Sequence, residues 1–244
     1  MRYELEKFFS NPCEASGLLI TEAPTGYGKT YETIQAIYRY IEKGGKSQIL
    51  FITNLLKNLP EDELRSIYEQ NGRGALFKKE VLVLSSAVSN VEKVILTENI
   101  PPEFQTDAYQ ELLSACQKKK QYQQQFGEAG KDITKHIDDQ IRKKLEPQFR
   151  RELEVHLQKT FPGGPGPRRD AIRNKEKYKW MATFYPAIFW TEYKVLLLSV
   201  KKLMARNISL VEPSFDCLSE RMLKNKIVCI DEFDASRSVI LDSL

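Results

Sequence analysis

The chain has 244 residues, of which 41% are hydrophobic and 10% aromatic, and it carries a formal net charge of +4. This composition can build a hydrophobic core and excludes a wholly disordered chain, and no run of 18 uncharged apolar residues is present to cross a membrane. The first residues are charged and contain no apolar signal sequence, and the four cysteines form no CxxC pair. We therefore expect a protein of the reducing cytoplasm, with no membrane partner, disulfide scaffold or zinc site.

The pattern of the first 60 residues predicts a strand, a glycine-containing loop, a helix and a second strand. An apolar run at 17–23 leads into the loop, and the apolar residues of 31–41 recur three and four positions apart, as they do on one face of a helix. Gly44 and Gly45 end this helix, and 48–53 is the next apolar run. Such a β-α-β unit predicts a parallel sheet covered by helices.

Three further strands are expected, at 80–84, 195–200 and 226–230. Between the first two of these, the segment 101–179 is rich in glutamine and lysine and has a helical pattern that is interrupted by the Pro/Gly segment 161–167. We expect two parts, an α/β core formed by 1–100 and 180–244 and a basic helical insertion at 101–179.

The insertion holds most of the positive charge. Between residues 117 and 180 there are 17 Lys and Arg against 9 Asp and Glu, a balance of +8. The basic residues come in groups, at 118–120, 142–144, 150–151 and 168–169. Two interpretations of the insertion remain. Its basic residues bind nucleic-acid phosphates, or it is a solvated helical hairpin.

The sequence Ala-Pro-Thr-Gly-Tyr-Gly-Lys-Thr at 23–30 fits a phosphate-binding loop, with Ala23 in place of the usual first glycine. Small residues let backbone N–H groups surround a phosphate, and the helix that begins near Lys29 directs its positive end at the anion. Lys29 can reach the β- and γ-phosphates, and the Thr30 hydroxyl can bind Mg²⁺. The expected ATP-binding residues are Thr25, Gly26, Tyr27, Gly28, Lys29 and Thr30.

The second half of the expected site follows the last strand. Asp231 and Glu232 come directly after the apolar residues 227–230, at the carboxyl end of a strand, where ligands bind in open α/β sheets. Asp231 can hold Mg²⁺ together with Thr30, and Glu232 can activate the water that attacks the γ-phosphate. The expected catalytic residues are Lys29, Asp231 and Glu232.

Together, residues 23–30 and the Asp-Glu-Phe-Asp sequence at 231–234 resemble motifs I and II of superfamily 2 DExD/H-box helicases and translocases. The layout is similar to that of CRISPR-associated helicases and related bacterial DNA translocases, which have His where this chain has Asp234. The resemblance implies a RecA-like P-loop NTPase fold, ATP and Mg²⁺ as cofactors, and a nucleic-acid partner. No glutamine precedes Gln35, so the glutamine motif of RNA-acting DEAD-box proteins is missing and DNA is favoured over RNA.

Two further segments resemble nucleic-acid-contacting motifs of this superfamily. Residues 50–56 lie where motif Ia lies in the superfamily. Residues 195–203 resemble a later strand and turn of the superfamily, with Ser199 in place of the usual threonine. The resemblance implies nucleic-acid contacts at Thr53, Asn54, Ser199 and Lys201.

The family also has a motif III strand after motif II and a second RecA-like domain that contributes arginines. Because the chain stops ten residues after Asp234, we expect an incomplete sheet and a fragment of a longer protein, with little or no ATP hydrolysis by the fragment alone. Two alternatives remain, a non-catalytic nucleotide- or nucleic-acid-binding interaction module with a degenerate P-loop core and, less favoured, a P-loop kinase.

Overall fold

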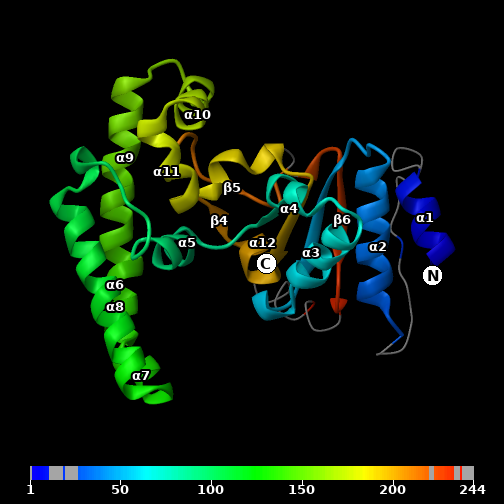
Figure 1. Cartoon of the computed structure of the whole chain (residues 1–244), viewed down its shortest axis with the longest axis horizontal. Coiled ribbons are helices and arrows are strands. Elements are labelled where there is room, and N and C mark those ends of the chain that lie inside the picture. Colours follow the sequence, from blue (N-terminus) through cyan, green and yellow to red (C-terminus); the bar gives the residue numbers. More distant parts are fainter. Residues whose placement is uncertain (1, 11–18, 20–26, 220–222, 234–236, 238–244) are drawn as a thin grey trace. The chain divides into compact units, whose positions relative to one another are not determined.

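The structure is a computed structural model of the chain (Figure 1), and it describes all residues except 1, 11–18, 20–26, 220–222, 234–236 and 238–244. The chain divides into two compact units. The core unit comprises Met1–Leu84, Trp190–Arg206 and Asp216–Leu244, and the helical unit comprises Ser85–Phe189 and Asn207–Phe215. None of the helices in the described part of the chain combines the length and the apolar character needed to span a bilayer.

A four-stranded parallel sheet forms the centre of the core unit, with the strand order β2-β3-β1-β6. Each strand is a short apolar run that begins and ends where the sequence predicts, within two residues. The pairing aligns Ile49 with Val195 and with Ile227, so the carboxyl ends of β1, β3 and β6 lie at one edge. The strands are β1 (Gln48–Thr53), β2 (Val81–Val83), β3 (Val195–Ser199) and β6 (Lys226–Ile230).

Helices cover one face of this sheet through a single hydrophobic cluster. Ile49 and Phe51 of β1 and Leu197 of β3 pack with apolar side chains of four helices, and α1 lies along the outer side of α2 (Figure 1). The helix pattern at 31–41 explains this, because Ile34, Ile37, Tyr38 and Ile41 are all buried. The helices of the core unit are α1 (Arg2–Ser10), α2 (Lys29–Glu42), α3 (Glu61–Gln70), α4 (Gly74–Glu80) and α12 (Val200–Met204), with a 3-10 turn at Leu56–Asn58.

The helical unit packs around a second hydrophobic cluster that is rich in aromatic side chains, among them Phe104, Phe149, Trp180 and Phe184. The helix α5 begins after Ser86, whose hydroxyl accepts a hydrogen bond from the Ser89 N–H at 3.1 Å. The helices of this unit are α5 (Ala87–Val94), α6 (Asp107–Phe126), α7 (Glu128–Ile133), α8 (Lys135–Gln140), α9 (Glu146–Thr160), α10 (Pro165–Asn174) and α11 (Glu176–Phe184), with a 3-10 turn at Pro102–Phe104. A further 3-10 segment, Pro186–Glu192, begins in this unit and ends in the core unit. A short ladder pairs β4 (Arg206–Asn207) with β5 (Phe215–Asp216).

The helices α8 and α9 are continuous through a π-helical turn at Ile141–Leu145. Pro147 lies two residues after the end of this turn, and a proline in a helix lacks the N–H that would bond to the carbonyl four residues earlier, with which its ring clashes. A wider turn removes this conflict, and π-turns of this kind occur as single insertions in α-helices. The proline therefore accounts for the local change of helix type.

The structure agrees with the expected α/β class and its central parallel sheet, while the expected first strand at 17–23 lies outside the described residues, apart from Leu19. The helical unit is wider than the predicted insertion at 101–179, since it begins at Ser85 and extends to Phe189. The difference arises because α5 and α11 pack their apolar faces into the helical cluster. The Pro/Gly segment ends α9 at Thr160, but α10 already begins at Pro165, because a helix needs no N–H at its first position.

Candidate nucleotide site

The residue that precedes α2 has a left-handed backbone. Gly28 is in the left-handed region with φ 74°, a conformation that favours glycine, and no atom of a described residue lies within 4 Å of the position that a Cβ would occupy. No side chain at the Gly28 position caps the helix, so the N–H groups of the first turn are suited to an anion. Tyr27 is exposed beside this turn, whereas Thr25 and Gly26 lie outside the described residues.

Asp231 is held against the sheet at the carboxyl end of β6. Its N–H donates a hydrogen bond to the Ile52 carbonyl at 2.9 Å, which extends the pairing of β6 with β1 by one residue. From this position its Oδ2 atom accepts a hydrogen bond of 2.6 Å from the Thr30 hydroxyl. The contact joins residues that are 201 positions apart, and it brings together the two residues that the sequence predicts as Mg²⁺ ligands.

The oxygen atoms of Thr30 and Asp231 suit Mg²⁺. A hydroxyl and a carboxylate are hard ligands, and their 2.6 Å separation places both within reach of one ion. The described residues contain no group of three or more His, Cys, Asp and Glu that could enclose a metal. Mg²⁺ fits such a sparse site, because it is usually bound by one or two protein groups and takes its other ligands from phosphate and water.

Glu232 has an unusual backbone and two defined hydrogen bonds. Its φ of 52° lies in the left-handed region, which is uncommon for a residue with a Cβ. Its N–H donates to Asp231 Oδ1 at 3.1 Å, and its Oε2 accepts a hydrogen bond of 3.0 Å from Asn58 Nδ2. The Glu232 side chain is exposed to solvent, where a nucleotide and a water molecule could reach it.

Asn58 is a member of the site that the sequence did not reveal. It ends the 3-10 turn that follows β1, four residues after Asn54, and no motif marks it. Only the adjacency of β1 and β6 in the sheet brings it to Glu232, so the strand order is the signal that could have identified it.

The neighbouring Cys229 takes no part in this chemistry. Burial, and to a lesser extent the negative charge of Asp231, raises the pKa of its thiol to about 12. At neutral pH it is therefore a protonated thiol and a poor nucleophile.

Two of the four expected nucleic-acid residues are adjacent in the structure. Thr53 and Ser199 are register partners at the carboxyl ends of β1 and β3, and both are buried. The Thr53 hydroxyl donates to the Leu55 carbonyl at 2.8 Å, and the Ser199 hydroxyl caps α12 by accepting from the Lys202 N–H at 3.3 Å. Both hydroxyls thus shape the segments after their strands.

The other two expected contacts are accessible from this edge of the sheet. Asn54 is partly exposed and directly follows β1, and Lys201 is exposed in the first turn of α12. A ligand at this edge would therefore meet Asn54 and Lys201 before it met either hydroxyl.

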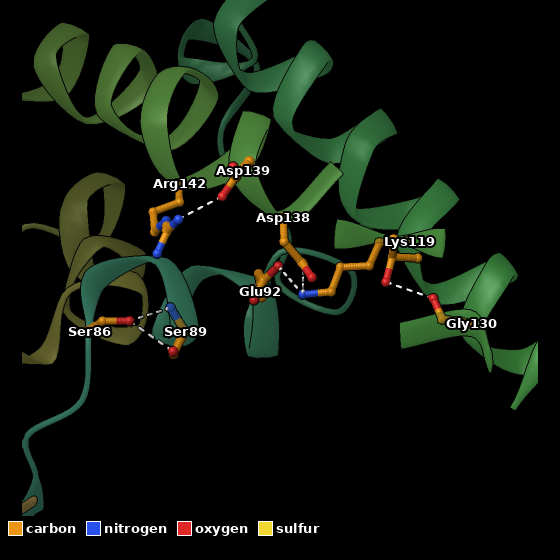
Figure 2. Close-up of polar contacts among 9 residues, drawn as sticks. Ser86, Ser89, Glu92, Lys119, Gly130, Asp138, Asp139 and Arg142 are labelled. Carbon is orange, nitrogen blue, oxygen red and sulfur yellow. Dashed lines mark hydrogen bonds and ion pairs between the residues drawn. The ribbon is translucent and has the colours of Figure 1, made fainter. Parts of the chain in front are cut away.

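In the helical unit, many of the grouped basic residues form internal ion pairs. Figure 2 shows the Lys119 ammonium between the carboxylates of Glu92 at 2.6 Å and Asp138 at 2.5 Å, and Arg142 paired with Asp139 at 2.6 Å. Lys119 is only 19% exposed, so it joins α5, α6 and α8 and is not presented to a ligand.

The remaining groups follow the same pattern. Arg150 pairs with Glu146 at 3.1 Å and with Glu154 at 2.7 Å, and Arg169 pairs with Glu212 at 2.8 Å. The positive balance of this segment therefore overstates the charge that is available at its surface. Within the described part of the chain, the exposed members of these groups that form no ion pair are Lys118, Lys120, Lys144 and Arg151.

No protein-family model matches the chain, and no curated protein is significantly similar to it in sequence. Its function is therefore inferred from the geometry of Gly28, Thr30, Asp231 and Glu232 at the carboxyl edge of the sheet.

Proposed function

We propose that the chain is the ATP-binding motor domain of a superfamily 2 helicase or translocase, with a RecA-like fold. In this proposal ATP hydrolysis drives movement along a nucleic acid, DNA in preference to RNA, or the unwinding of its strands. The observation that carries it is the 2.6 Å hydrogen bond between Thr30 and Asp231. It joins Thr30, the last residue of the expected phosphate-binding loop, to the acid at the carboxyl end of β6.

Each site residue has a defined task in this proposal. The backbone of 25–30 binds the phosphates of ATP, and Lys29 neutralises the β- and γ-phosphates. Thr30 and Asp231 would hold Mg²⁺, which when bound offsets the negative charge that builds up on the phosphates. Glu232 orients the attacking water and takes its proton.

We also propose two partners. A nucleic-acid strand would run along the sheet edge that presents Asn54 and Lys201, and a second RecA-like domain would complete the site with arginines. The order β3-β1-β6 supports this arrangement, because the two segments that resemble nucleic-acid motifs follow neighbouring strands, β1 and β3, and β1 pairs with the strand that precedes Asp231.

Replacing Lys29 by alanine tests nucleotide binding directly. We expect the Lys29→Ala variant to bind Mg·ATP at least about tenfold more weakly, because it loses a charge-assisted contact to phosphate, worth roughly 1.5–3 kcal/mol. Isothermal titration calorimetry on the 244-residue chain measures this affinity without requiring hydrolysis. The control is Lys43→Ala at the opposite end of α2, which should bind as the unchanged chain does. Absence of binding by the unchanged chain, or equal affinity of Lys29→Ala, would refute the proposal.

A test of the helical unit uses its exposed basic residues. If these side chains bind nucleic-acid phosphates, changing Lys118, Lys120, Lys144 and Arg151 together to alanine should weaken single-stranded DNA binding. It should also reduce the slope of log K against log salt by about 0.7 for each phosphate that is no longer neutralised. Fluorescence anisotropy at several salt concentrations measures both quantities. An unchanged slope would instead mean that the unit is a solvated hairpin or docks a protein.

A further inference from the structure

We propose that the end of α6 binds the bases of a single-stranded nucleic acid on two exposed aromatic rings. The rings belong to Tyr122 and Phe126, called the ring pair below, in the last two turns of α6, which α7 follows (Figure 1). This site lies in the helical unit. It therefore goes beyond the proposed function, which places nucleic acid at the sheet edge of the core unit.

The ring pair forms one stacked surface. The two ring centroids are 6.2 Å apart, and the ring planes are inclined by 30°. Residues four positions apart are neighbours on a helix, so both rings lie on the same side of α6. Tyr122 and Phe126 are 39% and 43% exposed, whereas most aromatic side chains of the helical unit are buried. A flat ligand can therefore reach the faces of these rings from solvent.

The backbone below the ring pair is held by the neighbouring helix. Gly130 of α7 comes so close that a Cβ at this position would lie 2.8 Å from the Tyr122 carbonyl oxygen and 3.0 Å from Gln123 Cα. The Gly130 N–H donates to the Gly127 carbonyl at 3.1 Å, which ties α7 to the end of α6. A surface that is already ordered loses less conformational entropy when a ligand binds to it.

Positive charge accompanies the ring pair. Residues 117–126 contain three lysines and no acidic residue. Lys119 is paired inside the helical unit, but Lys118 is exposed and lies four residues before Tyr122, on the same side of α6. An ammonium group beside stacked aromatic rings is suited to a nucleotide strand, in which charged phosphates accompany flat bases.

The polar neighbours of the ring pair favour a nucleic acid over a protein as its occupant. A protein that docks through apolar side chains needs a wide apolar patch, whereas the exposed residues of α6 around the rings include Gln121, Gln124 and Gln125. Their amides can donate hydrogen bonds to base edges and accept hydrogen bonds from them. A single strand is required, because bases in a duplex stack on one another and leave no face for a side chain. Every base has such a face, so we expect little preference for sequence.

The first test compares a short oligothymidylate with an abasic oligomer of the same length, by fluorescence anisotropy with the 244-residue chain. We expect the double variant Tyr122→Ala, Phe126→Ala to bind oligothymidylate at least about tenfold more weakly. The slope of log K against log salt should stay the same, because no charge is lost. The abasic oligomer has phosphates but no bases, so its affinity should not change. Alanine favours helices, and circular dichroism should show that α6 is intact.

Conservative variants distinguish stacking from apolar contact. The exchange Tyr122→Phe, Phe126→Tyr keeps two aromatic rings and should bind as the unchanged chain does. The double variant Tyr122→Leu, Phe126→Leu keeps apolar side chains without aromatic faces, and it should bind as weakly as the alanine variant. The control is Tyr3→Ala, which removes a ring of α1 that is 77% exposed and should not alter binding.

A second test locates the bound strand. An oligothymidylate that contains 5-iodouracil, irradiated while it is bound, should cross-link to the tryptic peptide 121–131, which carries both rings. Absence of this cross-link, or unchanged affinity of the double alanine variant, would overturn the inference. Equal weakening with the abasic oligomer would do so too, and full affinity of the leucine variant would point instead to a protein-docking surface.

Mg·ATP affinity, measured by calorimetry, separates this inference from the proposed function. It should be the same in all ring-pair variants and in the unchanged chain, because the rings are not part of the nucleotide site. Failure of the tests above leaves the proposed function standing. A chain that cross-links through the peptide 121–131 but does not bind Mg·ATP would support this inference and refute the proposed function.

Discussion

Replacing Glu232 by glutamine is expected to abolish most ATP hydrolysis while Mg·ATP binding stays intact. Glutamine has nearly the same shape, and its side-chain oxygen can still accept the hydrogen bond from Asn58, but it cannot take a proton from water. General base catalysis contributes roughly 10²–10⁴-fold to a rate, so we expect single-turnover hydrolysis to fall at least about a hundredfold. Rapid-quench measurement of ADP formation, together with calorimetry of nucleotide binding, separates the two effects in a protein that joins the chain to a second RecA-like domain.

Glu63→Gln is a suitable control for this experiment. Glu63 is an exposed acid in the first turn of α3, and the same change there should affect neither binding nor hydrolysis. Wild-type hydrolysis in Glu232→Gln would show that another group activates the water. If a protein that joins the chain to a second RecA-like domain binds Mg·ATP but does not hydrolyse it with or without DNA, the chain is a non-catalytic nucleotide-binding module.

The second large effect is expected in the helical unit. The Arg150 side chain is 16% exposed and pairs with Glu146, which is 2% exposed, and with Glu154. Removing one partner of a buried ion pair leaves the other charge unpaired, at a cost of about 3–5 kcal/mol. We therefore expect Arg150→Ala to lower the free energy of unfolding of this unit by that amount, measured by urea denaturation followed by circular dichroism at a helix wavelength.

The adjacent arginine provides the control. Arg151 is exposed and forms no ion pair with a described residue, so Arg151→Ala should change stability by no more than about 0.5 kcal/mol. Equal destabilisation in the two variants would contradict the structural role of Arg150.

The destabilisation in Arg150→Ala should also depend on pH. Burial raises the pKa of Glu146 above its ordinary value, although Arg150 opposes the shift. A carboxyl group with a raised pKa favours folding below its unfolded pKa, and this contribution is lost as the pH rises through the folded pKa. Without Arg150 the pKa of Glu146 rises further, so destabilisation should be largest at neutral pH and should diminish in acid as Glu146 becomes protonated.

Much of the core unit and part of the site could be predicted from the sequence. The strands β1, β3 and β6 are short apolar runs, and α2 has a regular apolar face, so local pattern alone identifies them. The meeting of Thr30 and Asp231 follows from a general property of parallel sheets, in which a loop at the carboxyl end of one strand approaches the carboxyl ends of its neighbours. These predictions needed no knowledge of individual side-chain contacts.

The contacts that could not be predicted depend on specific side-chain placement. The bond between Asn58 and Glu232 requires the order of β1 and β6, the turn after β1 and the left-handed backbone of Glu232, and none of these is encoded in a local pattern. The charge of Arg150 and Arg151 is equally visible in the sequence, yet one is paired and the other is exposed. Counts of charge cannot make that distinction, because it depends on the face of α9 that each residue occupies.

The π-turn between α8 and α9 also determines which side of this helix its apolar residues occupy. The residues of this helix that face the hydrophobic cluster recur at every fourth position, at Ile137, Ile141, Leu145, Phe149, Leu153 and Leu157. In a regular α-helix each step of four residues advances by about 40° beyond a full turn, so five such steps would carry the stripe about 200° around the axis and into solvent. A turn with more residues per revolution delays this drift, and the π-turn at 141–145 lies within the stripe where it has this effect. Spacing by four residues is therefore suited to the wide π-turn. Because this turn interrupts the α-helix, Ile137 and Leu157 can both face the same hydrophobic cluster.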